Sequence, residues 1–452
     1  MHHPELSIRA FPVLLFVLLA AASPAFSLGN VSPAVETAER EAAQWLLGQM
    51  VPNDIVPVPD PGRRRLLVSY RVPREDPAYR FIYGRSFVYD DALGAIALTM
   101  LGDYRQAEFV LNAMTRLVRP DGSLWFAYNT QNGWPEVGDT SGAIIRAGSV
   151  AWVGYAFTYY LTVRAKEKPD FSTSDPLGKE YCKAASAIAS FLLANQVKDP
   201  SDKRYGLLTG GTGSSTVTME AGSARPAEVY SSQPVRWVSM EHNIDAWFFL
   251  RALGRLTPDA NLSAAVDLIT ARLADLWSDK DGQFFQGILE NGKLDVSLPL
   301  DGASWGALYL LAQGRREQAS VCVEEMRTRF SSEADGLHGY LPYGSEPVYT
   351  DERVNKYFFP DEPGKLWRDT PFVWAEGSLG AAVALARTGN SAEAASIVDS
   401  FRGLAVAGGI RYASAPVQYQ FTDYPSVAST AWYIICVEAL KGRASADLFW
   451  RP

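Results

Sequence analysis

The stretch WVSMEHNIDAWFFL, residues 237–250, places acids at the start of an apolar helical run. Glu241 and Asp245 are four residues apart, so a helix presents both carboxyl groups on one face. Cleavage of a glycosidic bond needs such a pair, because one group protonates the leaving oxygen and the other activates water or attacks the sugar. The alternative is a simple helix cap, since Ser239 and a first-turn acid stabilise a helix N-terminus.

Similar junctions between polar and apolar sequence recur along the chain, as in VYDDALGAIAL (88–98) and WAEGSLGAAVAL (374–385). They begin runs that are apolar on nearly every face, which is typical of helices covered on all sides. We predict inner helices over residues 90–101, 149–163, 241–253, 301–312, 376–386 and 427–440. Amphipathic segments alternate with these runs and predict outer helices over residues 38–50, 104–118, 178–196, 262–277, 315–330 and 391–406.

The alternation of outer helix, turn, loop and inner helix occurs six times. Turns with Asp-Gly pairs follow several outer helices, as in SDKDGQFF and EADGLHGY. Repeats of uneven length favour a closed ring over an open solenoid, whose repeats would have a nearly constant length. We predict an all-α fold, an (α/α)6 barrel with short β-hairpins and long loops at one end. Residues 28–452 would form this single catalytic domain, with Gly210–Ser215 as a flexible loop over the cleft.

The sequence resembles the six-hairpin glycosidase superfamily over nearly all of residues 28–452. The resemblance rests on the six alternations and on the junctions at residues 88–98, 237–248 and 374–385. In several inverting members the acid lies at or just before the third inner helix, so the resemblance implies Glu241 as the proton donor. The base comes from another hairpin and stays open among four acids. These candidates are Asp91, Asp301, Glu376 and Asp423.

In such a barrel the inner helices run in one direction, so their N-termini and the preceding loops line one end. The sequence places carboxyl groups there with aromatic side chains beside them, as a sugar-binding cleft requires. The predicted substrate-binding residues are Tyr89, Asp90, Trp125, Trp134, Trp237, His242, Asp245, Trp374 and Asp423. The function predicted from these residues is an exported glycoside hydrolase, inverting because the concavity is wide, that acts on an oligo- or polysaccharide.

Other reactions fit the same fold. A polysaccharide lyase or uronate-processing enzyme would need cations and a base, and Arg85, Arg146 and Arg236 lie near the predicted end with Tyr89 or Tyr155. A different alternative is a non-catalytic glycan-binding or envelope assembly protein, in which the acids only cap helices.

A sugar epimerase on this barrel would need two histidines on different inner helices. Without the N-terminal leader the chain has only His242 and His338, and the second lies in the DGLHGY turn. His242 is therefore predicted to bind substrate. No His-x3-His pattern, cysteine cluster or EF-hand loop is present, so we expect neither a metal nor another cofactor.

The charge and the cysteine content of the chain exclude some classes of function. The net charge is −8, and after the N-terminal segment the chain has no Lys/Arg run except the short Arg63-Arg64-Arg65, so the charge pattern of a nucleic-acid-binding protein is missing. Cys182, Cys322 and Cys436 lie in helical runs and are predicted to be buried apolar residues rather than disulfide partners.

The N-terminus has the pattern of a secretory signal over residues 1–27. Arg9 precedes the apolar FPVLLFVLLAAA, and Ala25-Phe26-Ser27 forms a small-x-small cleavage site. This apolar core is shorter than the ~20 residues that a membrane span needs. We expect cleavage, export to the periplasm or the exterior, and no stable membrane span.

Overall fold

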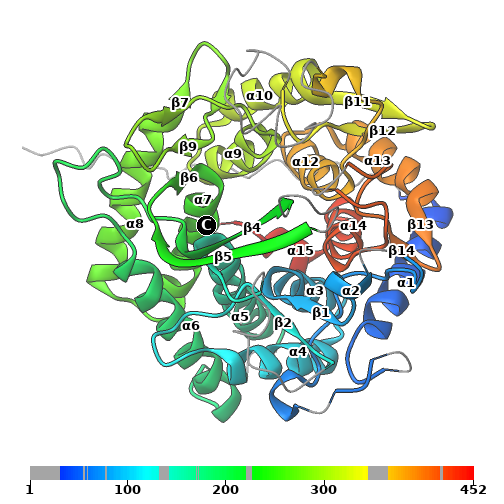
Figure 1. Cartoon of the computed structure of the whole chain (residues 1–452), viewed down its shortest axis with the longest axis horizontal. Helices are drawn as coiled ribbons and strands as arrows, with labels where there is room; N and C mark the ends of the chain where they lie inside the picture. Colours follow the sequence, from blue (N-terminus) through cyan, green and yellow to red (C-terminus); the bar gives the residue numbers. More distant parts are fainter. Residues whose placement is uncertain are drawn as a thin grey trace, which may run out of the picture.

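Two concentric rings of helices form the body of the structure, a computed structural model (Figure 1). It describes residues 31–451 except 54–55, 59, 77–78, 132–141, 169–170, 172, 220–225, 345–364 and 418–420. The inner ring consists of α3 (Val88–Met100), α5 (Ala147–Glu167), α7 (Met240–Leu256), α9 (Leu300–Ala312), α12 (Ala375–Arg387) and α14 (Val427–Leu440). Each inner helix packs against the next, and α14 returns to α3, so the ring is closed. The predicted (α/α)6 barrel is confirmed.

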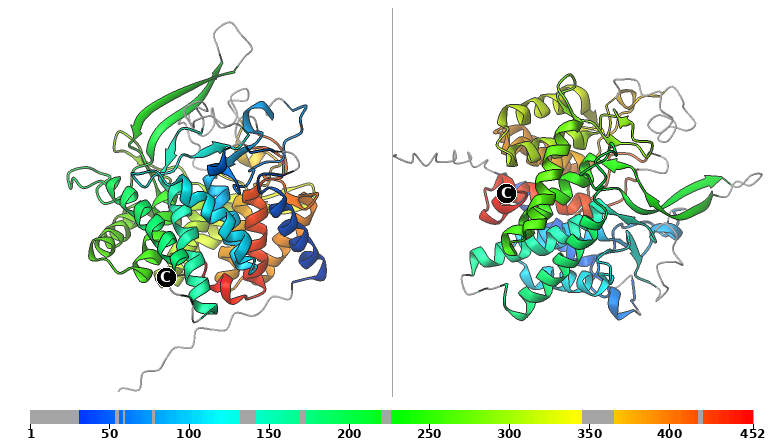
Figure 2. Two further views of the ribbon diagram at one scale, coloured as in Figure 1. Left: turned by 90° about the horizontal axis from the view of Figure 1, so that it is seen from below. Right: turned by 90° about the vertical axis from the view of Figure 1, so that its left-hand side faces the viewer.

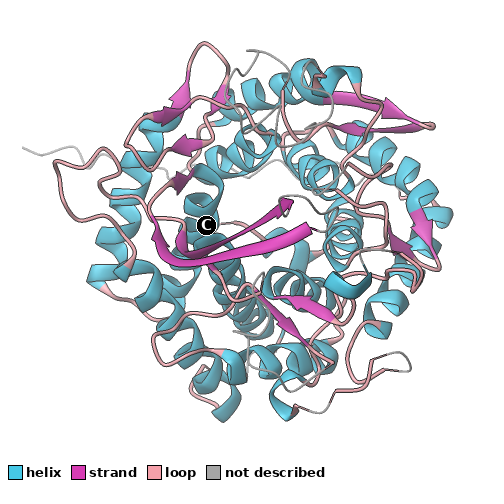
Figure 3. Ribbon diagram, in the orientation of Figure 1, coloured by secondary structure: helices cyan, strands magenta, loops and turns pink. Residues whose placement is uncertain are grey.

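The outer ring covers the inner one, helix by helix. It consists of α1 (Pro33–Gly48), α4 (Tyr104–Leu117), α6 (Pro176–Ala194), α8 (Ala260–Leu273), α10 (Arg316–Glu325) and α13 (Ser391–Ser400). Helix α1 packs on α14, and the other five pack on the inner helix that directly precedes them in the chain. Figure 3 shows both rings as helices, with the strands in the connections.

Three outer helices end earlier than predicted. Helices α8, α10 and α13 pass into the short turns Ala274–Leu276, Met326–Phe330 and Phe401–Leu404. Leu276, Phe330 and Leu404 remain buried in these turns, so the apolar spacing continues although the α-helical hydrogen bonding has stopped. A β-hairpin begins directly after each of these turns.

Glycines allow neighbouring inner helices to approach closely. A Cβ atom on Gly154 of α5 would lie 2.4 Å from the ring of Phe249 on α7. One on Gly380 of α12 would lie 2.5 Å from the indole of Trp305 on α9. Each of these glycines therefore leaves space for an aromatic ring of the neighbouring inner helix.

Short β-hairpins follow outer helices, as expected. They are β7 (Trp277–Ser278) with β8 (Gln283–Phe284), β11 (Ser331–Ala334) with β12 (Leu337–Tyr340), and β13 (Ala405–Val406) with β14 (Gly409–Ile410). Two further small sheets lie in the connections. One joins β1 (Arg85–Phe87) to β2 (Ala127–Asn129). In the other, β9 (Gly287–Ile288) pairs on one side with β6 (Val238–Ser239) and on the other with β10 (Leu294–Asp295), and all pairs are antiparallel. A short helix, α2 (Tyr79–Ile82), precedes β1.

A long hairpin stands over the end of the barrel where the inner helices begin. Strands β4 (Gly211–Met219) and β5 (Pro226–Val235) pair antiparallel, and β3 (Ile145–Arg146) pairs with the start of β4. The hairpin crosses the ring in Figure 1 and projects from the barrel in Figure 2. The prediction of a flexible loop at residues 210–215 is wrong, because this stretch begins β4. Gly211, with φ of 119°, allows the close crossing of β3: a Cβ there would lie 2.2 Å from the Ile145 carbonyl oxygen.

The C-terminus fills the opposite end of the barrel. After α15 (Ala444–Leu448), the Trp450 ring stacks on Phe248 with a centroid distance of 4.6 Å and an interplanar angle of 5°. Its centroid lies 5.0 Å from Trp152 and 5.3 Å from Trp305. In Figure 2, α15 lies at the end away from the long hairpin. The barrel is thus closed by aromatic side chains at this end. None of the helices in the described ranges is long and apolar enough to cross a membrane.

Candidate active site

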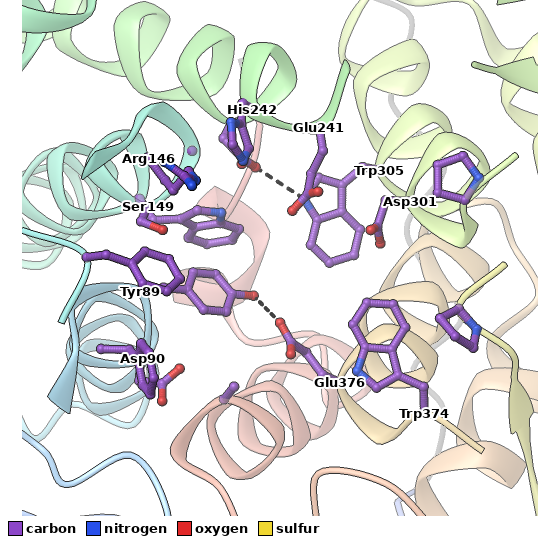
Figure 4. A pocket seen from close by; sticks show the side chains of 18 of the residues that line it. Tyr89, Asp90, Arg146, Ser149, Glu241, His242, Asp301, Trp305, Trp374 and Glu376 are labelled. Atoms are coloured by element: carbon purple, nitrogen blue, oxygen red, sulfur yellow. Dashed lines mark hydrogen bonds between the residues drawn. The ribbon is translucent and has the colours of Figure 1, made fainter. Parts of the chain in front are cut away.

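A cavity of about 490 Å³ opens at the end of the barrel where the inner helices begin. The second residue of every inner helix lines it (Figure 4). These six residues, here called the inner-helix rim, are Tyr89, Gly148, Glu241, Asp301, Glu376 and Ala428. Three successive helices of the ring, α7, α9 and α12, contribute the acids, and the other three contribute a tyrosine and two small residues.

Helix geometry explains which further residues reach the cavity. The sixth residue of a helix lies about one turn below the second and on the same face. Trp152, Asp245 and Trp305 occupy this sixth position and also line the cavity. Both Glu241 and Asp245 therefore face the cavity, as their four-residue spacing predicted.

Asp91 is the clearest departure from the predicted site. As the fourth residue of α3 it points about 200° away from the second residue, Tyr89. Its carboxylate is fully buried and accepts hydrogen bonds from the Leu67 amide at 2.7 Å and from the Ser86 hydroxyl at 2.8 Å. Asp91 therefore holds the β1 segment to α3 and is corrected here from a candidate base to a structural residue.

Glu376 lies at the wall of the cavity and is 8% exposed. The Tyr89 hydroxyl donates a hydrogen bond to its Oε1 at 2.6 Å, and Trp432 Nε1 donates to the Tyr89 oxygen at 3.0 Å. Burial raises the pKa of Glu376 to about 7, against the opposing effect of hydrogen bonds from Tyr89 and Tyr412. Glu376 is therefore poised between its neutral and charged forms near neutral pH.

Glu241 begins α7, where Ser239 caps the helix by accepting the His242 amide at 3.4 Å. Burial, with the negative charge of Glu376 as a second cause, raises the pKa of Glu241 to about 7. A helix N-terminus by itself would lower this pKa, so burial outweighs the helix dipole here. A carboxyl group with a raised pKa can hold a proton near neutral pH and can donate it.

Three aspartates complete the acidic lining. Asp245 accepts a hydrogen bond from Trp305 Nε1 at 3.2 Å, whereas Asp301 Oδ1 and Asp90 Oδ2 are buried without a hydrogen-bond partner. Burial is the main cause that raises the pKa of all three well above the usual range, and neighbouring carboxyl groups add to it. Asp90 and Asp301 thus keep acceptors available at the cavity wall.

His242 and Trp237 form the side of the cavity next to α5. Their ring centroids lie 5.4 Å apart, and the Arg146 guanidinium lies 5.8 Å from the Trp237 centroid. Burial and the charge of Arg146 lower the pKa of His242 to about 3, so its imidazole is neutral. A neutral imidazole can donate one hydrogen bond and accept another, as sugar hydroxyls require.

Replacing Gly148 by alanine is expected to displace the imidazole of His242. The added Cβ would lie 2.4 Å from His242 Cδ2, and the crowded site should lower the free energy of unfolding by about 1–3 kcal/mol. The matched control is Gly254→Ala on α7, where the nearest atom would lie 3.6 Å away. Because alanine favours a helix over glycine, this control should raise the unfolding free energy by about 0.5–1 kcal/mol. Urea denaturation measures both, and equal effects of the two variants would contradict the expected contact.

Several predicted substrate-binding residues line the cavity and others do not. Those that line it are Tyr89, Asp90, Trp237, His242, Asp245 and Trp374. Trp125 is half-buried elsewhere, with the Arg119 guanidinium 4.2 Å from its ring centroid, and the half-buried Asp423 does not line the cavity either. Trp134 lies outside the described residues. The cap of α14 is Ser426, not an acid.

The residues considered for other reactions are also distributed unevenly. Arg146 lines the cavity, whereas the buried Arg85 and the exposed Arg236 do not. The Tyr155 hydroxyl accepts the Trp450 amide at 2.6 Å, away from the cavity. His338 is exposed on β12 and pairs with Glu333 at 3.2 Å. The two histidines of an epimerase are therefore not brought together.

The sequence interpretation missed aromatic residues from two sources. Trp152 and Trp305 lie inside apolar helical runs, and they could have been found by aligning the inner helices at their second residue. Loops contribute the others, among them Tyr70, Phe126, Tyr343, Tyr412 and Phe421. No periodic pattern fixes the direction of a loop side chain, so these had no sequence signal.

Across the described ranges, no group of three or more His, Cys, Asp and Glu side chains is arranged to hold a metal ion. The three cysteines are free, with Cys322 and Cys436 buried and Cys182 half-buried.

Comparisons with known proteins identify the fold. No family model matches the chain, and no curated protein matches it. A solved glycosidase in complex with glucose is similar at a TM-score of 0.59 and 10% identity, over 90% of this chain and 96% of that chain. A D-mannose isomerase is similar at 0.56 and 10% identity, over 91% and 98%. The GH76 alpha-mannanase of Bacteroides thetaiotaomicron is similar at 0.53 and 9% identity, over 90% and 96%. The chain therefore shares the fold of these solved proteins, as the sequence resemblance implied.

Proposed function

We propose that the protein is a glycoside hydrolase that acts on an oligo- or polysaccharide. The observation that carries the proposal is the placement of Glu241, Asp301 and Glu376 at one register of three successive helices, around a cavity walled by aromatic side chains. Acids supply the proton transfers, and aromatic faces pack on the C–H faces of sugars. The likeness of the fold to glycosidases, one of them bound to glucose, agrees with it.

Within this proposal Glu241 is the general acid and Glu376 is the base. Tyr89 donates a hydrogen bond to Glu376, and a donated hydrogen bond favours the charged carboxylate. No group in the described part of the chain hydrogen-bonds the Glu241 carboxyl, and the charge of Glu376 favours its neutral form. When two such groups interact, one of them keeps the proton. That proton belongs on Glu241, next to the leaving oxygen.

The direct test is a panel of aryl glycosides and neutral oligosaccharides incubated with the wild-type protein. Release of reducing sugar from the oligosaccharides and of phenol from the aryl glycosides is expected from the wild-type protein, and the Glu241→Gln variant should no longer cleave the unactivated oligosaccharides. Interconversion of a free aldose and ketose without any hydrolysis would replace the proposal with sugar isomerisation. Unsaturated products from uronate polymers would replace it with a lyase reaction.

We propose that hydrolysis inverts the anomeric configuration. Helix α9 stands between α7 and α12 in the ring, so Asp301 separates Glu241 from Glu376, and an inverting enzyme needs room for water between substrate and base. Proton NMR of the first product, recorded before mutarotation, should show the anomer opposite to that of the substrate. Retention would assign Glu376, or Asp301, the role of a nucleophile.

The activity should depend on pH in a bell shape with its maximum near pH 7. Glu376 must be charged, so kcat/KM falls as pH drops below its pKa of about 7. Glu241 must be protonated, so kcat/KM also falls as pH rises above its pKa of about 7. The two limbs belong to the coupled pair rather than to single residues. Initial rates measured from acidic to alkaline pH check this, and a plateau that extends far above pH 7 would exclude Glu241 as the acid.

We also propose that the enzyme acts outside the cytoplasm. Residues 1–27 lie outside the described part of the chain, and the support is their signal-like pattern. Mass spectrometry of the protein recovered from a secreting host should find an N-terminus near Leu28. A mature protein that retains Met1 and stays in the cytoplasm would contradict export.

A further inference from the structure

The cavity carries far more acidic than basic side chains. Five carboxyl residues line it, on α3, α7, α9 and α12. They are Asp90, Glu241, Asp245, Asp301 and Glu376. Among the described residues of this lining, Arg146 has the one permanently cationic side chain, and His242 is neutral.

Arg146 is largely occupied by the protein itself. Its Nη1 donates to the carbonyl oxygens of Gly213 at 2.7 Å and of Ile145 at 3.1 Å, which ties β3 to β4. Its guanidinium also lies over the Trp237 ring. The Arg146 guanidinium therefore stabilises the base of the long hairpin and is not fully available to bind an anionic group of a ligand.

Two buried carboxyl oxygens at the cavity wall have no protein partner. Asp90 is 4% exposed, its Oδ2 is unpaired, and Ser69 provides a hydrogen bond to its carboxyl group. Asp301 Oδ1 is unpaired as well. Buried polar atoms are almost always hydrogen-bonded, so these two oxygens are set to receive donors from a ligand.

The walls and the floor of the cavity are aromatic. Trp237 and Trp374 line its sides, and Trp152 and Trp305 lie one helical turn below the rim. Below them Trp450 closes the barrel through its contacts with both rings. A ligand must therefore enter from the end that carries the long hairpin and must offer apolar faces to the indoles.

We propose, building on the hydrolase function above, that the cavity binds one uncharged sugar residue, whose hydroxyl groups donate to Asp90 and Asp301. Hydroxyls supply the donors that the unpaired oxygens lack, and pyranose C–H faces pack on the tryptophans. A uronic acid, a sulfated sugar or a phosphorylated sugar brings a second anion beside the charged Glu376, and like charges placed together in a dry site repel strongly. The site thus selects against negative charge.

The test is isothermal titration calorimetry of the wild-type protein with matched monosaccharides, which need no catalysis. The pairs are glucose with glucuronate, galactose with galacturonate, and mannose with mannuronate, each differing only at C6. At least one neutral hexose should bind, and its uronate should bind at least about tenfold more weakly. Binding of a uronate equal to or tighter than its neutral partner would overturn the proposal, and so would the failure of all three hexoses to bind.

Two adjacent variants test the role of the unpaired oxygen. Asp90→Asn should weaken binding of the neutral hexose about tenfold, because an amide nitrogen cannot accept a hydroxyl donor. Asp91→Asn is the control, since Asp91 faces away from the cavity, and it should leave this affinity unchanged. Near-ultraviolet circular dichroism confirms that both variants are folded. Equal losses in the two variants would show that Asp90 acts only through the fold.

The two proposals can fail separately. If a neutral hexose binds but no glycoside is cleaved, the hydrolase function fails and the sugar class stands. If glycosides of uronic acids are cleaved and neutral ones are not, the hydrolase function stands and the inferred sugar class fails.

Discussion

Replacing Glu241 by glutamine is expected to lower kcat for unactivated glycosides by about 100- to 10,000-fold, the range typical of a lost general acid. Glutamine keeps the size of the side chain and its place at the start of α7 but cannot release a proton. It also removes a carboxyl group whose pKa is raised by burial, so the fold should not be weakened. The loss should therefore appear in kcat rather than in stability.

The choice of leaving group separates proton donation from a structural effect. A glycoside of an acidic phenol departs without protonation, so the Glu241→Gln variant should retain much of its activity on such a substrate. Glu376→Gln should lose activity on both substrate types, because water still needs a base. Glu180→Gln, at an exposed position on α6, is the control and should leave both rates unchanged. Equal losses on both leaving groups in the Glu241 variant would remove Glu241 from the role of acid.

The fold was predictable because the inner helices are apolar on every face. Predicted starts at 149, 241 and 376 compare with observed starts at Ala147, Met240 and Ala375. A helix surrounded by other helices cannot keep a polar side, and this requirement is written in the sequence of every inner run. The order of outer and inner helices then followed from their alternation alone.

The site was harder to predict because helix phase is sensitive to the first residue. Helix α3 begins at Val88, two residues before the predicted start, where β1 ends at Phe87. An error of two residues rotates the expected direction of a side chain by about 200°. This rotation explains why Asp91 looked like a candidate for the cavity and why Tyr89 instead occupies the rim. At α7 the predicted start differed by one residue, and Glu241 was placed correctly toward the open end.

The remaining cavity residues could not be predicted because only the closed barrel brings them to the cavity. Trp152 and Trp305 have apolar neighbours in the sequence, which predicts that they are core residues. They do belong partly to the core, since each is at most 3% exposed. They line the cavity only because the rim above them leaves space and the C-terminus closes the barrel below. No local sequence pattern predicts that Trp450, near the end of the chain, packs against side chains of the inner helices.

Replacing Trp450 by alanine is therefore expected to lower the free energy of unfolding by about 3–5 kcal/mol, as for other buried tryptophans. The ring is 2% exposed and stacks on Phe248, and its loss would leave a void between α15 and the inner ring. Urea denaturation followed by circular dichroism measures the change. Arg451→Ala, the next residue, is the control: its ion pair with Asp447 at 3.3 Å is partly exposed, so its loss should cost at most about 1 kcal/mol.

The loss of the Trp450 ring should also change the pH dependence of the reaction, through two successive contacts. Trp450 supports the Trp305 ring, and Trp305 Nε1 donates to Asp245, one turn below Glu241 on α7. Loosening Trp305 would deprive the Asp245 carboxylate of a donor and admit water beneath Glu241, which weakens the burial that raises the Glu241 pKa. The alkaline limb of the pH profile should then move to lower pH in Trp450→Ala and remain nearly in place in Trp450→Phe, which keeps an aromatic ring on Phe248. A loss of stability in Trp450→Ala with an unchanged pH profile would confine the role of the C-terminus to closing the barrel.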